Sequence, residues 1–200
     1  MTPELTASLA GDWDELLQDS VSATPFQSRA WVEALLAESH GRARLILIRE
    51  GEDLIGLFPV RLSFRGWRTA RSFGVGPSDY LHPLARTGCE DEVTRIVQEH
   101  LRSLPVDLLD LHQIRSSAES VPYGSGEPQA KCLVIDLPSD FEAYKRRLGK
   151  SLRTDVNRGL RDASLTIERA RPEDIDRHLE TFLRLHRARW RARGLPGAFG

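Results

Sequence analysis

The stretch ARLILIREGEDLIGLFPVRLSFRGWRTARSFG, from Ala43 to Gly74, decides the fold class of this chain. It contains three runs of apolar and β-branched residues separated by the short turns GED and GW, which is typical of an antiparallel meander. Gly56 and Pro59 lie inside the second run, where both residue types weaken regular strand pairing. We therefore expect either a bulge, which would splay the sheet and open a cleft, or an irregular edge strand.

Two helical segments are expected before the meander. Asp12 is suited to cap a short helix that contains Trp13, and after a turn at Pro25 the residues Trp31 and Leu35 recur at helical spacing. We interpret Trp31 as a packing residue, because an aromatic ring on the apolar face of a helix usually packs into a core.

A helix and two further strands are expected after the meander. Residues 90–104 have apolar positions at helical spacing and acidic residues in their first turn. The segments VDLLDLHQI, residues 106–114, and AKCLVIDL, residues 130–137, are typical of buried strands. The pattern predicts the α+β class, in which helices form a sandwich with a mixed sheet.

The loop FGVGPSDYLHPLA, residues 73–85, carries candidate site residues. It combines the backbone freedom of Gly74 and Gly76 with the polar side chains of Asp79, Tyr80 and His82. A GxG without a third glycine and a following helix is a weak signal for phosphate binding. The segment is therefore interpreted either as a functional loop or as a plain connection.

Composition and charge narrow the class of protein. The hydrophobic content of 40% is enough for a buried core, so disorder is not expected. The formal net charge of −1 favours neither nucleic acid nor an anionic membrane as a partner of the whole chain, and we expect no DNA binding. The apolar runs are far shorter than the ~20 residues of a membrane span, so no integral membrane contact is expected.

The two cysteines and the N-terminus bear on the compartment. Cys89 and Cys132 have no CxxC spacing, and two thiols in a chain of this size suit a reducing compartment better than a disulfide framework. The first residues lack a positive segment followed by a long apolar one, which a secretory signal would need. The expected location is cytoplasmic.

The basic stretch YKRRLGKSLRTDVNRGLRD, from Tyr144 to Asp162, carries a local excess of positive charge. Its periodicity predicts helix, interrupted at Gly149, with Ser139 or Asp140 as the N-terminal cap. The cationic face can bind phosphates, or it is simply a solvated helix face. A platform for single-stranded nucleic acid is disfavoured, because no aromatic residue other than Tyr144 is interleaved with the cations.

The last segment resembles the start of a second domain. Residues 165–170, LTIERA, are a candidate strand, and Pro172 opens a long helix that Gly194 ends. Its apolar face includes His186 and Trp190 and is wide enough to need a sheet to cover it.

Several catalytic motifs are missing from the sequence. The six histidines are scattered, and no cluster has metal-ligand spacing, so no metal site is expected. The chain has no GxSxG elbow, no Walker A loop and no GxGxxG after a strand. The sequence therefore lacks the motifs that esterase, nucleotide hydrolase and dinucleotide-binding functions require.

Three passages, taken in order, resemble the FemAB-like and CelD-like acyltransferases, which have two consecutive GNAT-type domains. The first is FQSRAWVEALL followed by GLFPVRL and FGVGPSDYLHPL, which is similar to the N-terminal half of the CelD-like group. The others are the linker-like KSLRTDVNRGLRDASLTIERA and the terminal LHRARWRARGLPGAF. Together these passages cover most of residues 26–199.

The resemblance implies the fold and the reaction. It implies a GNAT-like mixed twisted sheet flanked by helices in residues 1–143, a basic helical linker in 144–163, and the start of a second GNAT-like domain in 164–200. The implied activity is transfer of an acyl group from acetyl-CoA or another acyl-CoA to an amine on a small molecule or carbohydrate precursor. CelD-like members are linked to cellulose or exopolysaccharide production.

The resemblance also assigns site residues by position. Asp79 or His186 would act as the base and Tyr80 as a proton donor. The residues expected to bind substrate are Lys150, Arg153, Arg158 and Trp190. For His186 and Trp190, packing of the helix face is the alternative to a role in chemistry.

The cofactor site is expected beyond Gly200. A GNAT-type domain binds the pyrophosphate of CoA at a strand-to-helix turn, and in the second domain that turn would follow this chain. We therefore expect that the rest of the second GNAT domain is missing and that this portion alone is inactive. Two alternatives stay open: a non-catalytic GNAT-like module that binds phosphate-bearing carbohydrate precursors, and RNA binding through the basic stretch.

Overall fold

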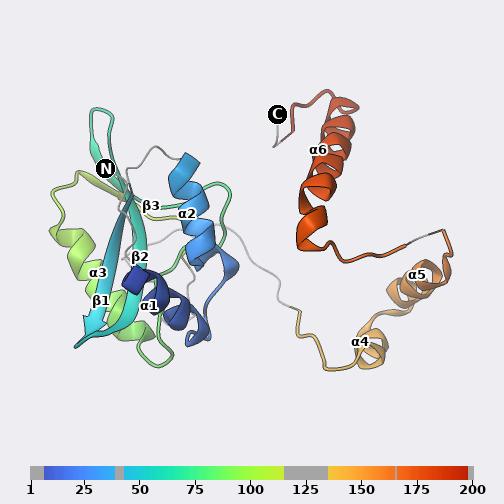
Figure 1. Ribbon diagram of the computed structural model, residues 1–200, viewed down its shortest axis with the longest axis horizontal. Coiled ribbons are helices and arrows are strands. Elements are labelled where there is room, and N and C mark those ends of the chain that lie inside the picture. Colours follow the sequence, from blue (N-terminus) through green and yellow to red (C-terminus); the bar gives the residue numbers. More distant parts are fainter. Residues whose placement is uncertain (1–6, 39–42, 115–134, 165, 198–200) are drawn as a thin grey trace. The chain divides into compact units, whose positions relative to one another are not determined.

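The computed structural model divides the chain into two compact units, and each is described by itself (Figure 1). The units are residues 1–132 and 133–200. The structure describes residues 7–38, 43–114, 135–164 and 166–197.

A mixed sheet forms the centre of the first unit. The predicted meander is confirmed: β1 (Ala43–Glu50), β2 (Asp53–Phe64) and β3 (Arg68–Ser72) pair antiparallel. Two short strands complete the sheet, β4 (Leu84–Ala85), antiparallel to β2, and β5 (Leu108–Asp110), parallel to β3. The strand order is β1-β2-β3-β5, with β4 beside β2.

Strand β2 contains the predicted bulge. The register with β1 shifts between Ile48 and Arg49, which leaves Ile55 as the extra residue before Gly56. The edge alternative is wrong, because β2 pairs with β1 along one side and with β4 and then β3 along the other. Pro59 is accommodated at the junction of these two partners, where it has no amide hydrogen to donate.

Helices cover both faces of the sheet. One face packs against α1 (Ala7–Gln18) and α2 (Arg29–Glu38), which are joined through the 3₁₀ turn η1 (Pro25–Gln27). The other face packs against α3 (Glu90–Ser103). The unit is therefore an α+β fold with a mixed open sheet between helices.

Each face has its own buried core. The core beneath α1 and α2 contains Trp13, Leu16, Val32, Leu36, Ala43, Leu54, Leu57, Phe73 and Leu84. The core beneath α3 contains Ile48, Ile55, Phe58, Val60, Ala70, Ala85, Val93, Val97 and Leu101. Leu54 and Leu57 share a face although they are three residues apart, because the bulge between them adds a residue to the strand.

The prediction that Asp12 caps the first helix is wrong. Helix α1 begins at Ala7, so Asp12 lies in its interior. Its carboxylate forms an ion pair with the guanidinium of Arg49 on β1. The side chain is used for a contact between helix and sheet, which helical periodicity alone does not disclose.

The predicted strand over residues 106–114 is much shorter than expected. Strand β5 has three residues, and Leu108 is 54% exposed rather than buried. Among the described strands β5 lies at the end of the sheet, so it pairs on one side with β3. Of the second predicted strand, 130–137, residues 130–134 lie outside the described residues, and 135–137 are exposed and not in a strand.

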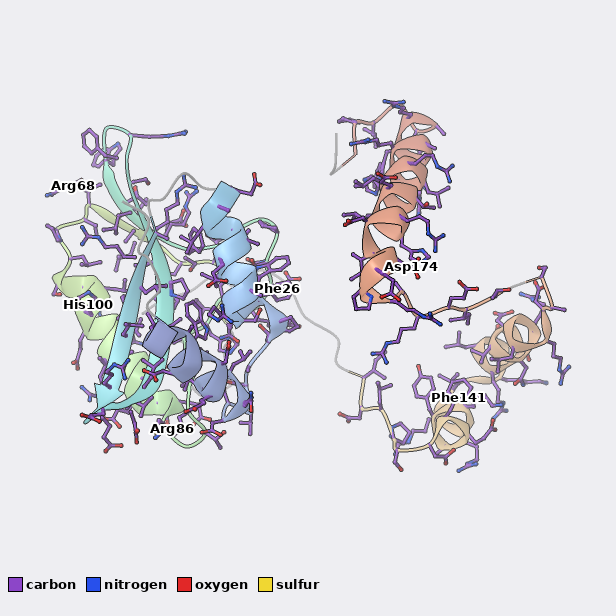
Figure 2. The ribbon with its side chains drawn as sticks, viewed as in Figure 1. Phe26, Arg68, Arg86, His100, Phe141 and Asp174 are labelled. Carbon is purple, nitrogen blue, oxygen red and sulfur yellow. The ribbon has the colours of Figure 1, made fainter. Side chains whose placement is uncertain are left out.

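The second unit contains helices α4 (Phe141–Arg147), α5 (Lys150–Arg161) and α6 (Ile175–Arg191), the last preceded by the 3₁₀ turn η2 (Pro172–Asp174). The predicted break at Gly149 is confirmed. Asp140 is the cap of α4, because its carboxylate accepts hydrogen bonds from the backbone amides of Glu142 and Ala143 at 2.8 and 3.2 Å. Figure 2 labels Phe141 and Asp174 at the starts of α4 and of α6.

The predicted strand over residues 165–170 is wrong where the structure describes it. Residues 166–170 form no strand, and Ile167 is 94% exposed. A strand needs a partner to satisfy its backbone groups, and the described part of this unit contains no other strand.

No residue among 135–164 and 166–197 is buried. The helices of this unit have apolar stripes, but Leu152, Leu160 and Leu179 on these stripes are each at least half exposed. Among the helices of the described residues, none combines the length and the apolar character that a membrane crossing requires.

Candidate functional site

The loop that follows β3 is held by Trp31. The indole Nε1 of Trp31 donates a hydrogen bond to Ser78 Oγ at 2.8 Å, and Ser78 is buried. The Ser78 amide donates to the Gly74 carbonyl at 3.2 Å. Phe26, labelled in Figure 2, packs edge-on against Trp31 with ring centroids 5.3 Å apart. Trp31 therefore packs against Phe26 rather than into either buried core, and its indole N–H holds the loop.

Gly74 is required by the shape of this loop. Its φ of +95° is in the region that favours glycine, and a Cβ there would lie 2.7 Å from Ser78 Oγ and 3.0 Å from a methyl group of Leu35. Gly76 has a φ of +111° but open space around it. At Gly74 a side chain would clash with its neighbours, whereas at Gly76 only the positive φ favours glycine.

Among the residues that the structure describes, two other than glycine adopt left-handed backbone conformations, and hydrogen bonds connect their segments. Tyr80 has a φ of 57° and Gln113 a φ of 56°. The Leu81 amide donates to the Gln113 carbonyl at 2.8 Å, and Gln113 Nε2 donates to Asp79 Oδ1 at 2.9 Å. Each such conformation costs about 1–3 kcal/mol and is typical of functional sites. The strain presents Asp79 with its carboxylate held by Gln113.

An Asp–His pair lies immediately before Gln113. His112 Nε2 is 2.7 Å from Asp110 Oδ1, and the guanidinium of Arg71 on β3 forms an ion pair with the other oxygen of Asp110. Both Asp110 and His112 are partly buried, with side chains 23% and 35% exposed. A carboxylate that orients an imidazole is the arrangement of a general base with its positioning partner.

Arg68 and Asp107 lock the strand pair that carries this site. Figure 2 labels Arg68 at the start of β3, and its backbone amide and Nη2 donate to the Asp107 carboxylate at 2.7 and 2.9 Å. The hydrogen bond from the Arg68 side chain, followed by that from its backbone, lowers the pKa of Asp107. The same contact raises the pKa of Arg68. The parallel pairing of β3 with β5 is therefore anchored just before Asp110.

The space beneath the loop is too small for a substrate. The cavity has a volume of about 20 Å³ and is lined mainly by apolar side chains, among them Leu57, Pro59 and Phe73. Such a volume accommodates about one water molecule. Gln27 Nε2 donates to the His82 carbonyl at 2.8 Å on the wall of this cavity. A substrate of this site would therefore lie on the surface above the loop.

The structure brings together two of the seven predicted site residues. Asp79 and Tyr80 are consecutive in the first unit, next to Gln113. The other five belong to the second unit, on the helices α5 and α6: Lys150, Arg153, Arg158, His186 and Trp190. Asp79 and Tyr80 therefore belong to one compact unit and the other five residues to the other unit.

The cations of α5 are exposed. Lys150 and Arg153 lie on the surface of the helix, and Arg158 is paired with Asp155 at 2.8 Å. The pairing leaves Lys150 and Arg153 as the larger part of the cationic face.

His186 and Trp190 form an aromatic row on α6. The ring centroids of Phe182 and His186 are 5.9 Å apart, as are those of His186 and Trp190. The chain turns at Gly194 and returns so that a Cβ on Gly197 would lie 2.9 Å from His186 Nε2 and 3.1 Å from Trp190. The backbone of Gly197 thus packs on His186 and Trp190, which are partly buried, whereas Phe182 is half exposed.

Sequence reasoning missed Asp110, His112 and Gln113. It interpreted residues 106–114 as a buried strand and assigned no role to them. The available signal was the occurrence of three polar residues within four positions at the end of an apolar run. The contact of Gln113 with Asp79 is tertiary, across 34 residues, and no local pattern indicates it.

Among the described residues, no group of three or more His, Cys, Asp and Glu side chains is placed to hold a metal ion. Comparison of the chain with models of known protein families, with curated proteins and with solved structures gave no match.

Proposed function

We propose that this chain is part of an N-acyltransferase of the FemAB-like or CelD-like kind, in which the first unit forms one wall of the acceptor site. The observation that carries the proposal is the Asp79 carboxylate, held by Gln113 in a strained loop at the end of a mixed sheet. In this proposal the sheet has the GNAT-like fold, and the acceptor is an amine on a small molecule or a carbohydrate precursor.

The acceptor amine must lose a proton before it attacks a thioester. Gln113 occupies one oxygen of Asp79, and the carboxylate can accept further hydrogen bonds through its remaining lone pairs. An ammonium acceptor would bind there and transfer its proton to the carboxylate, directly or through a water molecule. Tyr80 lies next to this position and would help to orient the acceptor.

His112 is the second candidate for the base. Its ring is oriented by Asp110, and Asp110 is in turn neutralised by Arg71. Histidine is the side chain that serves most often as a general base in enzymes. We therefore assign the proton transfer to Asp79 and His112 as alternatives, to be separated by substitution.

The first unit is poorly suited to hold the acyl donor. The connection from β3 to α3 ends in a helix whose first turn carries Glu90, Asp91 and Glu92. These carboxylates oppose binding of a pyrophosphate at the helix N-terminus. The proposal therefore places no acyl-CoA site at the N-terminus of α3.

The test uses the complete reading frame that contains this chain, titrated with acetyl-CoA by calorimetry. We expect saturable binding, and with an amine acceptor we expect Asp79→Asn or His112→Gln to lower kcat by about 10²–10⁴-fold, with the acetyl-CoA affinity unchanged. Asp91→Asn, on the exposed first turn of α3, is the matched control and should leave kcat unchanged.

Absence of saturable acetyl-CoA binding would refute the enzyme and favour the non-catalytic module. RNA binding through α5 would instead appear as an affinity that falls steeply with salt and is lost in Arg153→Ala.

A further inference from the structure

Two arginines oppose each other on a part of the sheet that the described helices leave open. Arg61 of β2 and Arg71 of β3 are register partners, and Asp110 of β5 is the register partner of Arg71. Directly opposite residues project from the same face with Cβ atoms about 4.5–5.5 Å apart. Arg61, Arg71 and Asp110 therefore form one row across three strands.

The row lies on the face that packs against α1 and α2. Val60 and Ala70 point to the core beneath α3, so their neighbours Arg61 and Arg71 point to the opposite face. On that face the buried core ends with Ala43 and Phe73, and both arginines are exposed. The row of Arg61, Arg71 and Asp110 thus begins where α1 and α2 no longer cover the sheet.

The charges of the row are unbalanced. The carboxylate of Asp110 neutralises the charge of Arg71 in an ion pair, whereas Arg61 forms no ion pair with any residue that the structure describes. Like charges directly opposite each other in a sheet are destabilising, so the stability of the sheet does not explain why Arg61 and Arg71 face each other. A dianionic ligand would offset the repulsion, because each guanidinium offers several donors in a fixed plane.

We propose that Arg61 and Arg71 bind the phosphate group of a phosphomonoester on the open sheet face. His112 Nε2 lies 2.7 Å from the carboxylate of Asp110, and the next residue, Gln113, holds Asp79. A phosphate bound by the row would anchor the acceptor next to the candidate bases. The role in acyl transfer rests on the proposed function, whereas binding of the anion does not.

A phosphate fits the row better than a carboxylate does. A carboxylate has two oxygens, which one guanidinium can satisfy, as Asp110 does for Arg71. A phosphomonoester has three terminal oxygens and a charge close to −2 at neutral pH, which match two guanidinium groups.

The test is a titration of the 200-residue chain with inorganic phosphate and with glucose 6-phosphate, followed by NMR of the arginine Nε–Hε signals at constant ionic strength. Both probes should give saturable shifts with a Kd on the order of 1–10 mM, and acetate should not saturate. Arg61→Gln should weaken binding about tenfold, since it removes charge-assisted hydrogen bonds. Arg65→Gln, the same change on an exposed arginine of the neighbouring hairpin turn, should leave the Kd unchanged.

A second variant gives an effect of opposite sign. Asp110→Asn releases Arg71 from its carboxylate and should strengthen phosphate binding several-fold, which loss of structure would not do. The proposal is overturned if Arg61→Gln binds phosphate as the unaltered chain does, if Arg65→Gln weakens binding equally, or if acetate binds as tightly as phosphate. Each of these results is independent of acetyl-CoA binding, so failure here leaves the proposed function standing.

Discussion

Helices α3 and α6 have similar apolar stripes but different surroundings. On α3 the side chains of Val93, Val97 and Leu101 are fully buried against the sheet. On α6 the side chains of Leu179 and Phe182 are half exposed, and the described part of its unit contains no strand. The comparison teaches that periodicity specifies which face of a helix is apolar, while burial requires a partner surface.

The two units are consequently stabilised by different interactions. A fully buried apolar side chain of the first unit contributes about 1.5–3 kcal/mol. The helices of the second unit are supported by local ion pairs three residues apart, such as Glu142–Lys145 and Asp174–Arg177, which contribute only about 0.2–0.5 kcal/mol each. We expect the first unit to unfold cooperatively and the second to fray.

Of the tests of this comparison, a pair of tryptophan substitutions has the largest expected effect. Trp13 is 0% exposed, and its Nε1 donates to the Gln27 carbonyl at 2.9 Å. Trp13→Ala should lower the free energy of unfolding by about 3–5 kcal/mol, measured by urea denaturation. Trp190→Ala should change it by less than about 1 kcal/mol. Equal losses would mean that the second unit shares the cooperative core.

A pair of glycine substitutions should have effects of opposite sign. A Cβ on Gly56 would lie 2.7 Å from both methyl groups of Val93, so Gly56→Ala forces α3 away from the sheet. We expect a loss of about 1–3 kcal/mol in the free energy of unfolding. Gly159 on α5 has open space, and Gly159→Ala should increase the helix content measured by circular dichroism. A stabilising Gly56→Ala would contradict the packing of α3.

The cap of α4 gives a smaller and local effect. Asp140→Ala removes the acceptor of two backbone amides, which should destabilise this helix by about 0.5–2 kcal/mol. The loss should appear in the Cα chemical shifts of residues 141–147, while the urea midpoint of the first unit stays unchanged. Ser139→Ala, the alternative cap, is the control and should have no effect.

The smallest effect depends on pH. The contact with Arg68 lowers the pKa of Asp107, so the contact stabilises the fold above the unfolded pKa of about 3.9 and is lost as the pH falls through the lower folded value. Asp107→Asn should therefore lower the urea midpoint at pH 7, and the difference should vanish in acid. Glu52→Gln, on an exposed turn, should show no such dependence. A difference that stays constant as the pH falls below about 3.9 would contradict the assignment.

Local patterns predicted the elements whose cause is local. The meander, α3 and the break at Gly149 follow from alternation, from helical spacing and from a glycine. Strand β4 and the true length of β5 could not be predicted, because two or three residues form a strand only if a partner is near. The candidate strand 165–170 failed for the same reason.

The candidate site divides in the same way. Asp79 and Tyr80 were predicted because a loop with two glycines and polar residues is visible in the sequence. The left-handed backbone of Tyr80 is visible only in the structure, and the hydrogen bonds of its neighbours Asp79 and Leu81 with Gln113 are tertiary contacts. The roles of Asp110 and Arg71 likewise depend on the parallel register between β3 and β5.

The bulge in β2 has a consequence for how the length of this strand can vary. Ile55 is the one residue of β2 in this stretch without a partner on β1, since Leu54 pairs with Arg49 and Gly56 with Ile48. A chain that lacked Ile55 would restore continuous alternation and keep Leu54 and Leu57 on their present faces. A deletion a few positions later would reverse the facing of every residue on one side of it. In this stretch Ile55 is therefore the position at which a deletion would keep the register of β2, although it would remove a side chain from the core beneath α3.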